Sequence, residues 1–190
     1  MLIELDEQKL FIDQLKKKFL IKKEQIKEKF LCDNKALKSC LDHSKIIDSL
    51  IIQMFEFLSK DKKYLKNLFS ICAVGGYGRK ILAPYSDLDI LFIYKKDFDP
   101  KKIKNVIEFI LFPLWDLGFK IGYAVRNIEE SITFFESDHV IQTSMLDCRL
   151  ICGSKMIYQE VLHHFKFCTK RNGLRLLENK ILERKKRIVE

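Results

Sequence analysis

Two stretches of this sequence, Val74-Gly-Gly-Tyr-Gly-Arg79 and Ser86-Asp-Leu-Asp-Ile-Leu-Phe-Ile-Tyr94, decide which fold the chain adopts. The first follows the apolar run 68–74, so its glycines allow a tight turn after a strand and leave backbone N–H groups uncovered for phosphate oxygens. A plain turn is the alternative for this stretch alone, because neither a Walker A loop nor the dinucleotide-binding glycine spacing is present. The second stretch predicts a strand over 88–94 that is apolar on both faces apart from one acid.

Asp87 and Asp89 stand two residues apart at the start of that strand, which puts both carboxylates on one face. Neighbouring carboxylates disfavour each other's charge unless a cation lies between them. Mg²⁺ prefers such oxygen ligands together with the phosphates of a substrate. Two exposed acids at a strand edge are the alternative, but core residues surround this pair in the sequence. The two motifs together therefore predict a site for a metal-bound polyphosphate.

The segments around these motifs predict an α+β fold in which a small mixed sheet lies between helices. The first helix, 4–31, carries one apolar stripe, and polar residues interrupt the second register that a coiled coil would need. The other predicted helices are 44–58, 99–117, 128–135, 140–145, 154–168 and 172–187, and the predicted strands are 68–74, 88–94, 119–125 and 148–152. We expect an N-terminal helical segment over 1–66, a core over 67–153 and C-terminal helices over 154–190.

Composition limits the class of protein without naming a partner. A hydrophobic content of 47% over 190 residues excludes wholesale disorder. The net charge of +9 permits nucleotides, RNA or an acidic protein as partners, and a merely Lys-rich composition explains it equally well. The six cysteines show no pairing pattern, the N-terminus is not typical of a signal peptide, and the longest apolar run, 109–115, is too short to cross a membrane. We therefore expect a cytoplasmic protein with reduced thiols and no membrane partner.

Further motifs narrow this pattern to a family. Pro113-Leu-Trp-Asp-Leu-Gly118, Val125-Arg126 and Leu146-Asp-Cys-Arg-Leu150 follow the glycine turn and the acid pair in order along the chain. Together the motifs resemble the N-terminal nucleotidyltransferase region of the bacterial protein-PII uridylyltransferases, which belong to the superfamily typified by DNA polymerase beta. The resemblance covers most of the chain, and only the combination of motifs is specific.

This resemblance implies a Mg²⁺-dependent transfer of UMP from UTP to a tyrosine of the PII signal protein in nitrogen regulation, with release of pyrophosphate. Gly75 and Gly76 would hold the triphosphate through backbone N–H groups. Asp87 and Asp89 would bind two Mg²⁺ ions that activate the tyrosyl oxygen and stabilise charge on the phosphates.

Ser86, Arg79 and Arg126 are the further nucleotide-binding residues that the resemblance implies. The two arginines are candidate partners of phosphate oxygens. For Arg79 a solvated loop cation is the alternative, and for Arg126 a surface ion pair.

The chain departs from the family pattern at two places near the expected site. Lys80-Ile81 stands where the family usually has Gly-Glu, and Gly122-Tyr123-Ala124 where it usually has Gly-His-Ser. Superfamily members commonly use a third carboxylate on a later strand, but 119–125 contains no acid. Asp147 is the best substitute as a catalytic acid, and a helix-end position or an ion pair with Arg149 is its alternative reading.

Two alternative functions keep the same fold. The net charge and the cluster Arg184-Lys-Lys-Arg187 favour a nucleotidyltransferase that acts on RNA. The changes at Lys80, Tyr123 and Ala124 favour a degenerate nucleotide-binding module without turnover. Because the family's UMP-removing and sensing modules find no counterpart in the sequence, we expect a transferase module alone, whether an excised piece, a split gene product or a remnant.

Overall fold

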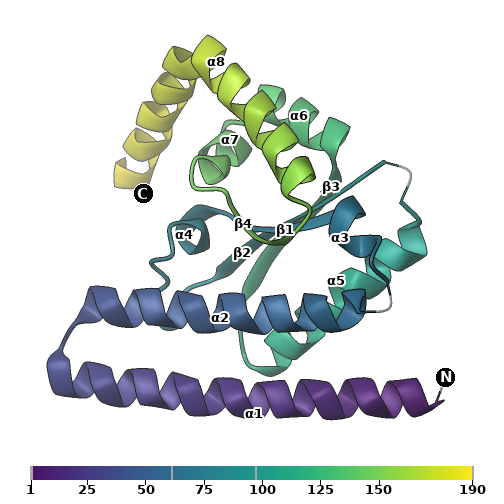
Figure 1. The fold of residues 1–190 in the computed structure, drawn as a ribbon. Helices are drawn as coiled ribbons and strands as arrows, with labels where there is room; N and C mark the ends of the chain where they lie inside the picture. The colour runs from purple at the N-terminus through teal and green to yellow at the C-terminus, as the bar shows by residue number, and fades with distance from the viewer. Residues whose placement is uncertain (1, 61, 97, 190) are drawn as a thin grey trace.

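The computed structural model describes residues 2–60, 62–96 and 98–189, in which helices enclose one mixed β-sheet (Figure 1). The helices are α1 (Leu2–Asp33), α2 (Ala36–Ser59), α3 (Leu65–Leu68), α4 (Gly75–Gly78), α5 (Pro100–Asp116), α6 (Ile128–Ser137), α7 (His139–Met145) and α8 (Lys155–Val189). The strands are β1 (Phe69–Ala73), β2 (Leu88–Tyr94), β3 (Ile121–Asn127) and β4 (Arg149–Gly153). The predicted α+β class with a small mixed sheet is confirmed.

The sheet brings the two decisive motifs to one of its ends. Its strand order is β3-β2-β1-β4, with β1 antiparallel to both β2 and β4, and β2 parallel to β3. Ala73 at the end of β1 therefore lies opposite Ile90 near the start of β2 and opposite Arg149 at the start of β4. Asp89 pairs with Gly122 of β3 in the parallel ladder. The glycine turn and the acid pair consequently meet at the same end of the sheet.

Both faces of the sheet are covered by helices, which explains why β2 is apolar on both sides (Figure 1). On one face, Ile90 and Phe92 belong to the core cluster that α1, α2 and α5 share. On the other face, Leu91 and Ile93 pack with residues of α6 and α8. Because side chains alternate along a strand, Asp89 shares the face of Leu91 and Ile93.

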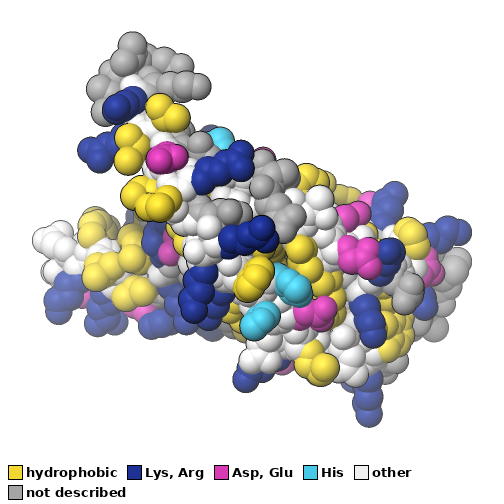
Figure 2. All heavy atoms as spheres, turned by 90° about the horizontal axis from the view of Figure 1, so that it is seen from above, with side chains coloured by type: hydrophobic (Ala, Val, Ile, Leu, Met, Phe, Trp, Pro, Cys, Tyr) yellow, Lys and Arg dark blue, Asp and Glu magenta, His cyan; other side chains and the backbone are white. Residues whose placement is uncertain are grey.

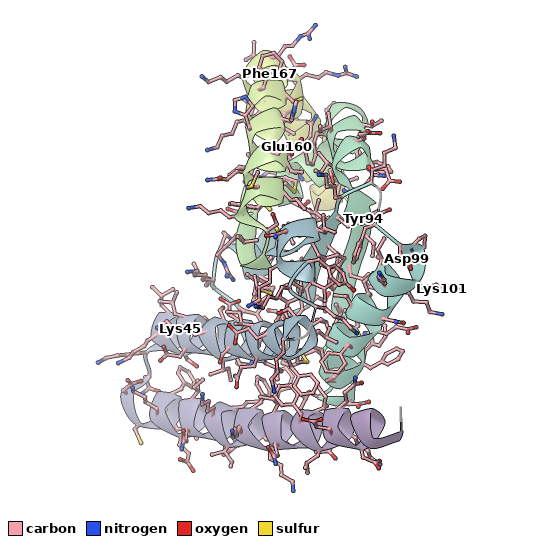
Figure 3. All side chains as sticks on the ribbon, turned by 45° about the vertical axis from the view of Figure 1, so that its right-hand side comes forward. Lys45, Tyr94, Asp99, Lys101, Glu160 and Phe167 are labelled. Carbon is pink, nitrogen blue, oxygen red and sulfur yellow. The ribbon has the colours of Figure 1, made fainter. Side chains whose placement is uncertain are left out.

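The crossover from β2 to β3 follows the sequence prediction. Figure 3 labels Tyr94, the last residue of β2, and Asp99 with Lys101 at the start of α5. Asp99 Oδ1 accepts a hydrogen bond from the Lys101 backbone N–H at 2.9 Å, and Pro100 occupies the first helical position. The predicted helix start is confirmed, and α5 returns the chain so that β3 runs parallel to β2.

The two C-terminal helices predicted at 154–168 and 172–187 are wrong, because α8 is one helix from Lys155 to Val189. Gly173 lies inside it, and a single glycine costs a helix only about 1 kcal/mol, too little to force an end. Figure 1 shows that the helix bends sharply about halfway along its length. The predicted start of the second helix at 44 is also too late, since α2 begins at Ala36.

The predicted division of the chain at 66 and 153 stays a prediction. In the structure, Ile47 and Ile51 of α2 share one core cluster with Phe69 of β1 and Phe92 of β2. The cysteines are thiols rather than disulfides. Within the residues described, no helix has both the length and the apolar character needed to span a membrane.

Candidate active site

The glycine turn follows β1 and lies against Asp89. The Val74 backbone N–H donates to the Asp89 carbonyl oxygen at 3.0 Å, which ties the start of the turn to β2. Gly75 then adopts a φ of +56°, in the left-handed region. A Cβ atom at this position would lie 2.9 Å from Asp89 Oδ2. Glycine is therefore favoured both by the backbone conformation and by the carboxylate beside it.

A second glycine leaves room on the other side of the same carboxylate. A Cβ atom at Gly122, the ladder partner of Asp89 on β3, would lie 2.7 Å from Asp89 Oδ1. Asp89 is half-buried, and burial first and the charge of Asp87 second raise the pKa of its carboxyl. The environment thus disfavours the ionised form of Asp89, and Asp87 is close enough to contribute.

Neither carboxylate has a protein partner among the residues that the structure describes. Among the described side chains, no ion pair or side-chain hydrogen bond involves Asp87 or Asp89, although the chain carries 35 Lys and Arg residues. Two neighbouring carboxylates with uncovered oxygens suit a hard divalent cation, which would offset their repulsion. Over 2–60, 62–96 and 98–189, no three His, Cys, Asp or Glu side chains group into a metal site. A cation here would complete its shell with water or phosphate oxygens.

A pocket of about 360 Å³ opens beside Asp89, between β2 and β3 on one side and α7 on the other. This volume lies in the usual range for small-molecule sites. A larger pocket, about 700 Å³, lies between α1 and α5 but includes neither the acid pair nor the glycine turn, so size alone does not select the site. The pocket beside Asp89 is lined by Val74, Asp89, Ile90, Leu91, Gly122, Tyr123, Ala124, Arg126, Val140, Ile141, Ser144 and Met145.

Arg126 lines the same pocket as Asp89, which joins two of the predicted site residues. Its guanidinium lies over the ring of Phe134, 4.5 Å from the centroid, and forms no ion pair with the residues described. Burial lowers the pKa of Arg126, and the charges of Asp138 and Glu130 oppose that shift. The alternative of a surface ion pair is therefore absent from the described part of the chain. Tyr123 and Ala124, where the family pattern is lost, also border the pocket.

The other predicted residues lie around the glycine turn. Arg79 is exposed, and its Nη1 lies 2.7 Å from Asp147 Oδ2 in an ion pair. The expected alternative partner of Asp147, Arg149, is instead bound to Asp48. Ser86 is exposed in the loop before β2. The catalytic role of Asp147 and the nucleotide contacts of Arg79 and Ser86 stay predictions.

Sequence reasoning missed a network beneath the turn. Tyr77 donates its hydroxyl to Asp48 Oδ1 at 2.6 Å, and Arg149 binds both oxygens of Asp48 at 2.8 and 3.1 Å. One signal was available, because Asp48 interrupts the helical apolar pattern that contains Ile47 and Ile51. The wall that α7 adds to the pocket had no such signal, since three of its lining residues, Val140, Ile141 and Met145, are apolar.

The geometry of this candidate site suits a metal-bound polyphosphate, and a comparison with protein-family models gives the class of protein. The model described as nucleotidyltransferase domain matches residues 51–151, which include the glycine turn, the acid pair and Arg126. The chain belongs to the nucleotidyltransferase domain family.

Its curated relatives include bifunctional uridylyltransferase/uridylyl-removing enzymes. The chain is 35% identical over 152 residues to the bifunctional uridylyltransferase/uridylyl-removing enzyme of Phenylobacterium zucineum, an alignment that covers 76% of this chain and 16% of the relative. The enzyme of the same name from Azospirillum brasilense is 36% identical over 121 residues, covering 63% of this chain and 13% of the relative. The chain thus spans at most 16% of the length of these relatives.

The solved structures that are similar to this chain include a crystal structure described as the toxin-antitoxin with AMP-PNP. It has a TM-score of 0.40 and 11% identity, and covers 69% of this chain and 97% of that chain. A likeness this weak carries no argument about the function of this chain.

Proposed function

We propose that this chain transfers UMP from Mg²⁺-bound UTP to a tyrosine of a PII-type signal protein and releases pyrophosphate. One observation carries the proposal: the Asp89 carboxylate, next to Asp87, lies between Gly75 and Gly122, lines a pocket and has no ion-pair partner among the described residues. The word uridylyltransferase in the names of the relatives supports the choice of UTP.

Each part of the site has a distinct task in this proposal. Asp87 and Asp89 hold the divalent cations, and their mutual repulsion falls when the cations bind. The backbone N–H groups of Gly75 and Gly76 donate to phosphate oxygens. Arg126 supplies an unpaired positive charge inside the pocket for a further anionic oxygen of the nucleotide. When bound, the cations neutralise charge on the phosphates and lower the pKa of the acceptor hydroxyl.

The lining of the pocket next to the acids suits the binding of a nucleoside. Leu91, Ala124 and Met145 present apolar surface, and Ser144 adds a hydroxyl. A flat, partly polar nucleoside fits such a mixture of apolar walls and few polar groups. The acceptor tyrosine would approach from the solvent side, where Asp87 is exposed.

The test is transfer of label from α-labelled UTP to a PII-type protein in the presence of Mg²⁺. We expect label on the protein and release of pyrophosphate, and a rate at least roughly 100-fold lower in Asp89→Asn and in Asp87→Asn. Asp116→Asn is the matched control, because Asp116 is an exposed acid at the end of α5 that pairs with Lys16 at 2.6 Å. Its rate should stay within about twofold of the wild-type rate, as for an exposed ion pair.

The same reactions separate the other functions. Label on RNA rather than on protein would indicate that the acceptor is RNA. UTP binding without turnover would indicate a degenerate nucleotide-binding module. Figure 2 shows one face of the molecule, on which Lys and Arg side chains are scattered among hydrophobic and acidic ones rather than gathered into one patch. An unchanged rate in Asp89→Asn would reject the proposed metal site, and faster transfer from another nucleoside triphosphate would reject UTP.

A further inference from the structure

Three side chains from distant parts of the sequence meet beneath the glycine turn. Asp48 belongs to α2, Tyr77 to the turn itself and Arg149 to the start of β4. Tyr77 is fully buried, and the side chains of Arg149 and Asp48 are only 18% and 17% exposed. Asp48 accepts three hydrogen bonds, one from the Tyr77 hydroxyl and two from the Arg149 guanidinium. The acid is thus fully engaged by its two partners.

The guanidinium also binds the backbone of the turn. Arg149 Nη2 donates to the Tyr77 carbonyl oxygen and Arg149 Nε to the Gly78 carbonyl oxygen, each at 3.3 Å. The Arg149 guanidinium also lies over the Tyr77 ring, 5.4 Å from its centroid. Since the Val74 N–H already ties the start of the turn to Asp89, these bonds fix its other end.

The contribution that we expect from this network is to the orientation of the glycine turn rather than to the stability of the fold. A buried ion pair adds little net stability over apolar residues of the same volume, because both charges lose their hydration. The planar guanidinium of Arg149, however, sets the position of the carbonyl groups to which it donates. Since displacing a reacting group by about 1 Å can cost a factor of about 100 in rate, the orientation of a phosphate-binding turn matters more than its stability.

We propose that Asp48, Tyr77 and Arg149 are positioning residues that hold the glycine turn in its phosphate-binding orientation. This inference rests on the proposed function, in which the turn binds the triphosphate of UTP. It makes α2, a helix with no residue in the pocket, a determinant of nucleotide affinity through Asp48.

Two variants test the network in the full chain. Tyr77→Phe removes only the hydroxyl that Asp48 accepts, and Arg149→Lys keeps the charge but loses the fork. We expect the Kd for Mg²⁺-UTP to rise roughly tenfold in Arg149→Lys and roughly threefold in Tyr77→Phe. The KM for the protein acceptor should stay within about twofold, a split that a general loss of folding would not produce. Ile47→Val is the matched control, since Ile47 is buried in α2 beside Asp48 and its apolar side chain cannot join the hydrogen bonds of the network.

Amide hydrogen exchange provides a readout that does not need nucleotide. The Gly78 N–H, which donates to the Val74 carbonyl oxygen at 3.0 Å, should exchange roughly tenfold faster in Arg149→Lys, with the amides of β2 unchanged. If the exchange rises but the wild-type chain binds no UTP, the network positions the turn and the proposed function is what fails. Unchanged Gly78 exchange, an unchanged Kd for Mg²⁺-UTP, or an equal rise in Ile47→Val would overturn the inference.

Discussion

Two acids at the same end of the sheet differ in how their charge is accommodated. Asp48 has a side chain only 17% exposed and accepts hydrogen bonds from Tyr77 and from both ends of the Arg149 fork. Asp89 is half-buried and has no partner for its carboxylate among the described residues. Folding satisfies nearly all buried polar groups, so a satisfied acid indicates structure and an unsatisfied one indicates a ligand.

The residues around the two acids differ in the same way as the hydrogen bonding of the acids themselves. Around Asp48 the chain supplies donors from the glycine turn and from β4. Around Asp89 it supplies Gly75 and Gly122, which have no side chain that could contact the carboxylate, and a second acid, Asp87. A site that disfavours its own charge in the absence of ligand gains when a cation arrives, at some expense of the stability of the empty protein.

Truncating each acid should give the largest contrast. Asp48→Ala leaves Arg149 mostly buried without its partner, so we expect the free energy of unfolding to fall by about 3 kcal/mol. Asp89→Ala removes a carboxylate that has no partner and an acidic neighbour, so the metal-free protein should change by less than about 0.5 kcal/mol or become more stable. Urea unfolding of the metal-free proteins measures both values.

Asp42→Ala controls for the loss of an acid from α2, because Asp42 pairs with the exposed Lys45 at 3.0 Å. Its effect should stay below about 1 kcal/mol. Equal losses in Asp48→Ala and Asp89→Ala would remove the distinction between a structural and a ligand-binding acid.

His43 shows that an unpartnered buried group is not by itself a functional one. The residue is 5% exposed, and neither ring nitrogen has a hydrogen-bond partner in the described part of the chain. Unlike a carboxylate, an imidazole can avoid the cost of burial by staying neutral near pH 7. Burial first and the charge of Lys23 on α1 second lower the pKa of His43 below its usual 6.5.

This shift predicts a loss of stability in acid. Below about pH 6.5 the unfolded chain binds a proton at His43 that the folded chain resists, so stability is complete above that pH and falls as the pH drops towards the lowered pKa. The slope contributed by His43 can reach about 1.4 kcal/mol per pH unit. We expect His43→Phe to reduce the slope of unfolding free energy between about pH 6.5 and 5. His163→Phe, at an exposed position, should leave it unchanged; the opposite pattern would contradict the assignment.

The meeting of the glycine turn and the acid pair at one end of the sheet was predictable because these residues are close in the sequence. Asp87 lies just before β2 and Asp89 within it, and the turn at Gly75 precedes them by only one loop, so their spacing in the sequence brings them to one end of the sheet. The start of α5 was predictable for the same reason, since Asp99 and Pro100 act locally.

Contacts between distant residues had no comparable signal. Asp48 and Arg149 are 101 residues apart, and only the pairing of β1 with β4 brings Arg149 under the turn. The continuous α8 was missed because a single glycine, Gly173, costs too little to end a helix that good helix formers continue on both sides. Gly122 next to Asp89 likewise depends on the register of the parallel ladder.

Lys80 offers a test, with the smallest expected effect, of how firmly the Asp48 network holds the glycine turn. It ends the glycine turn with a φ of +61°, in the left-handed region, and its N–H donates to the Tyr77 carbonyl oxygen at 3.1 Å. This conformation costs a residue with a Cβ atom roughly 1–2 kcal/mol, partly offset in glycine by the entropy it loses on folding. Lys80→Gly should therefore raise the free energy of unfolding by about 0.5–1 kcal/mol in urea titrations.

Lys166→Gly is the matched control, since Lys166 lies exposed within α8, where glycine should cost about 1 kcal/mol. The opposite signs would show that the strain at Lys80 comes from its backbone and not from the loss of a lysine. Because Arg149 binds the carbonyl groups of the two residues at 77 and 78, the backbone that leads into Lys80 is fixed from below. Arg149→Lys should accordingly shrink the gain from Lys80→Gly, since a loosened turn can relax the strain without glycine. Equal gains in both backgrounds would mean that the turn keeps this conformation without the network.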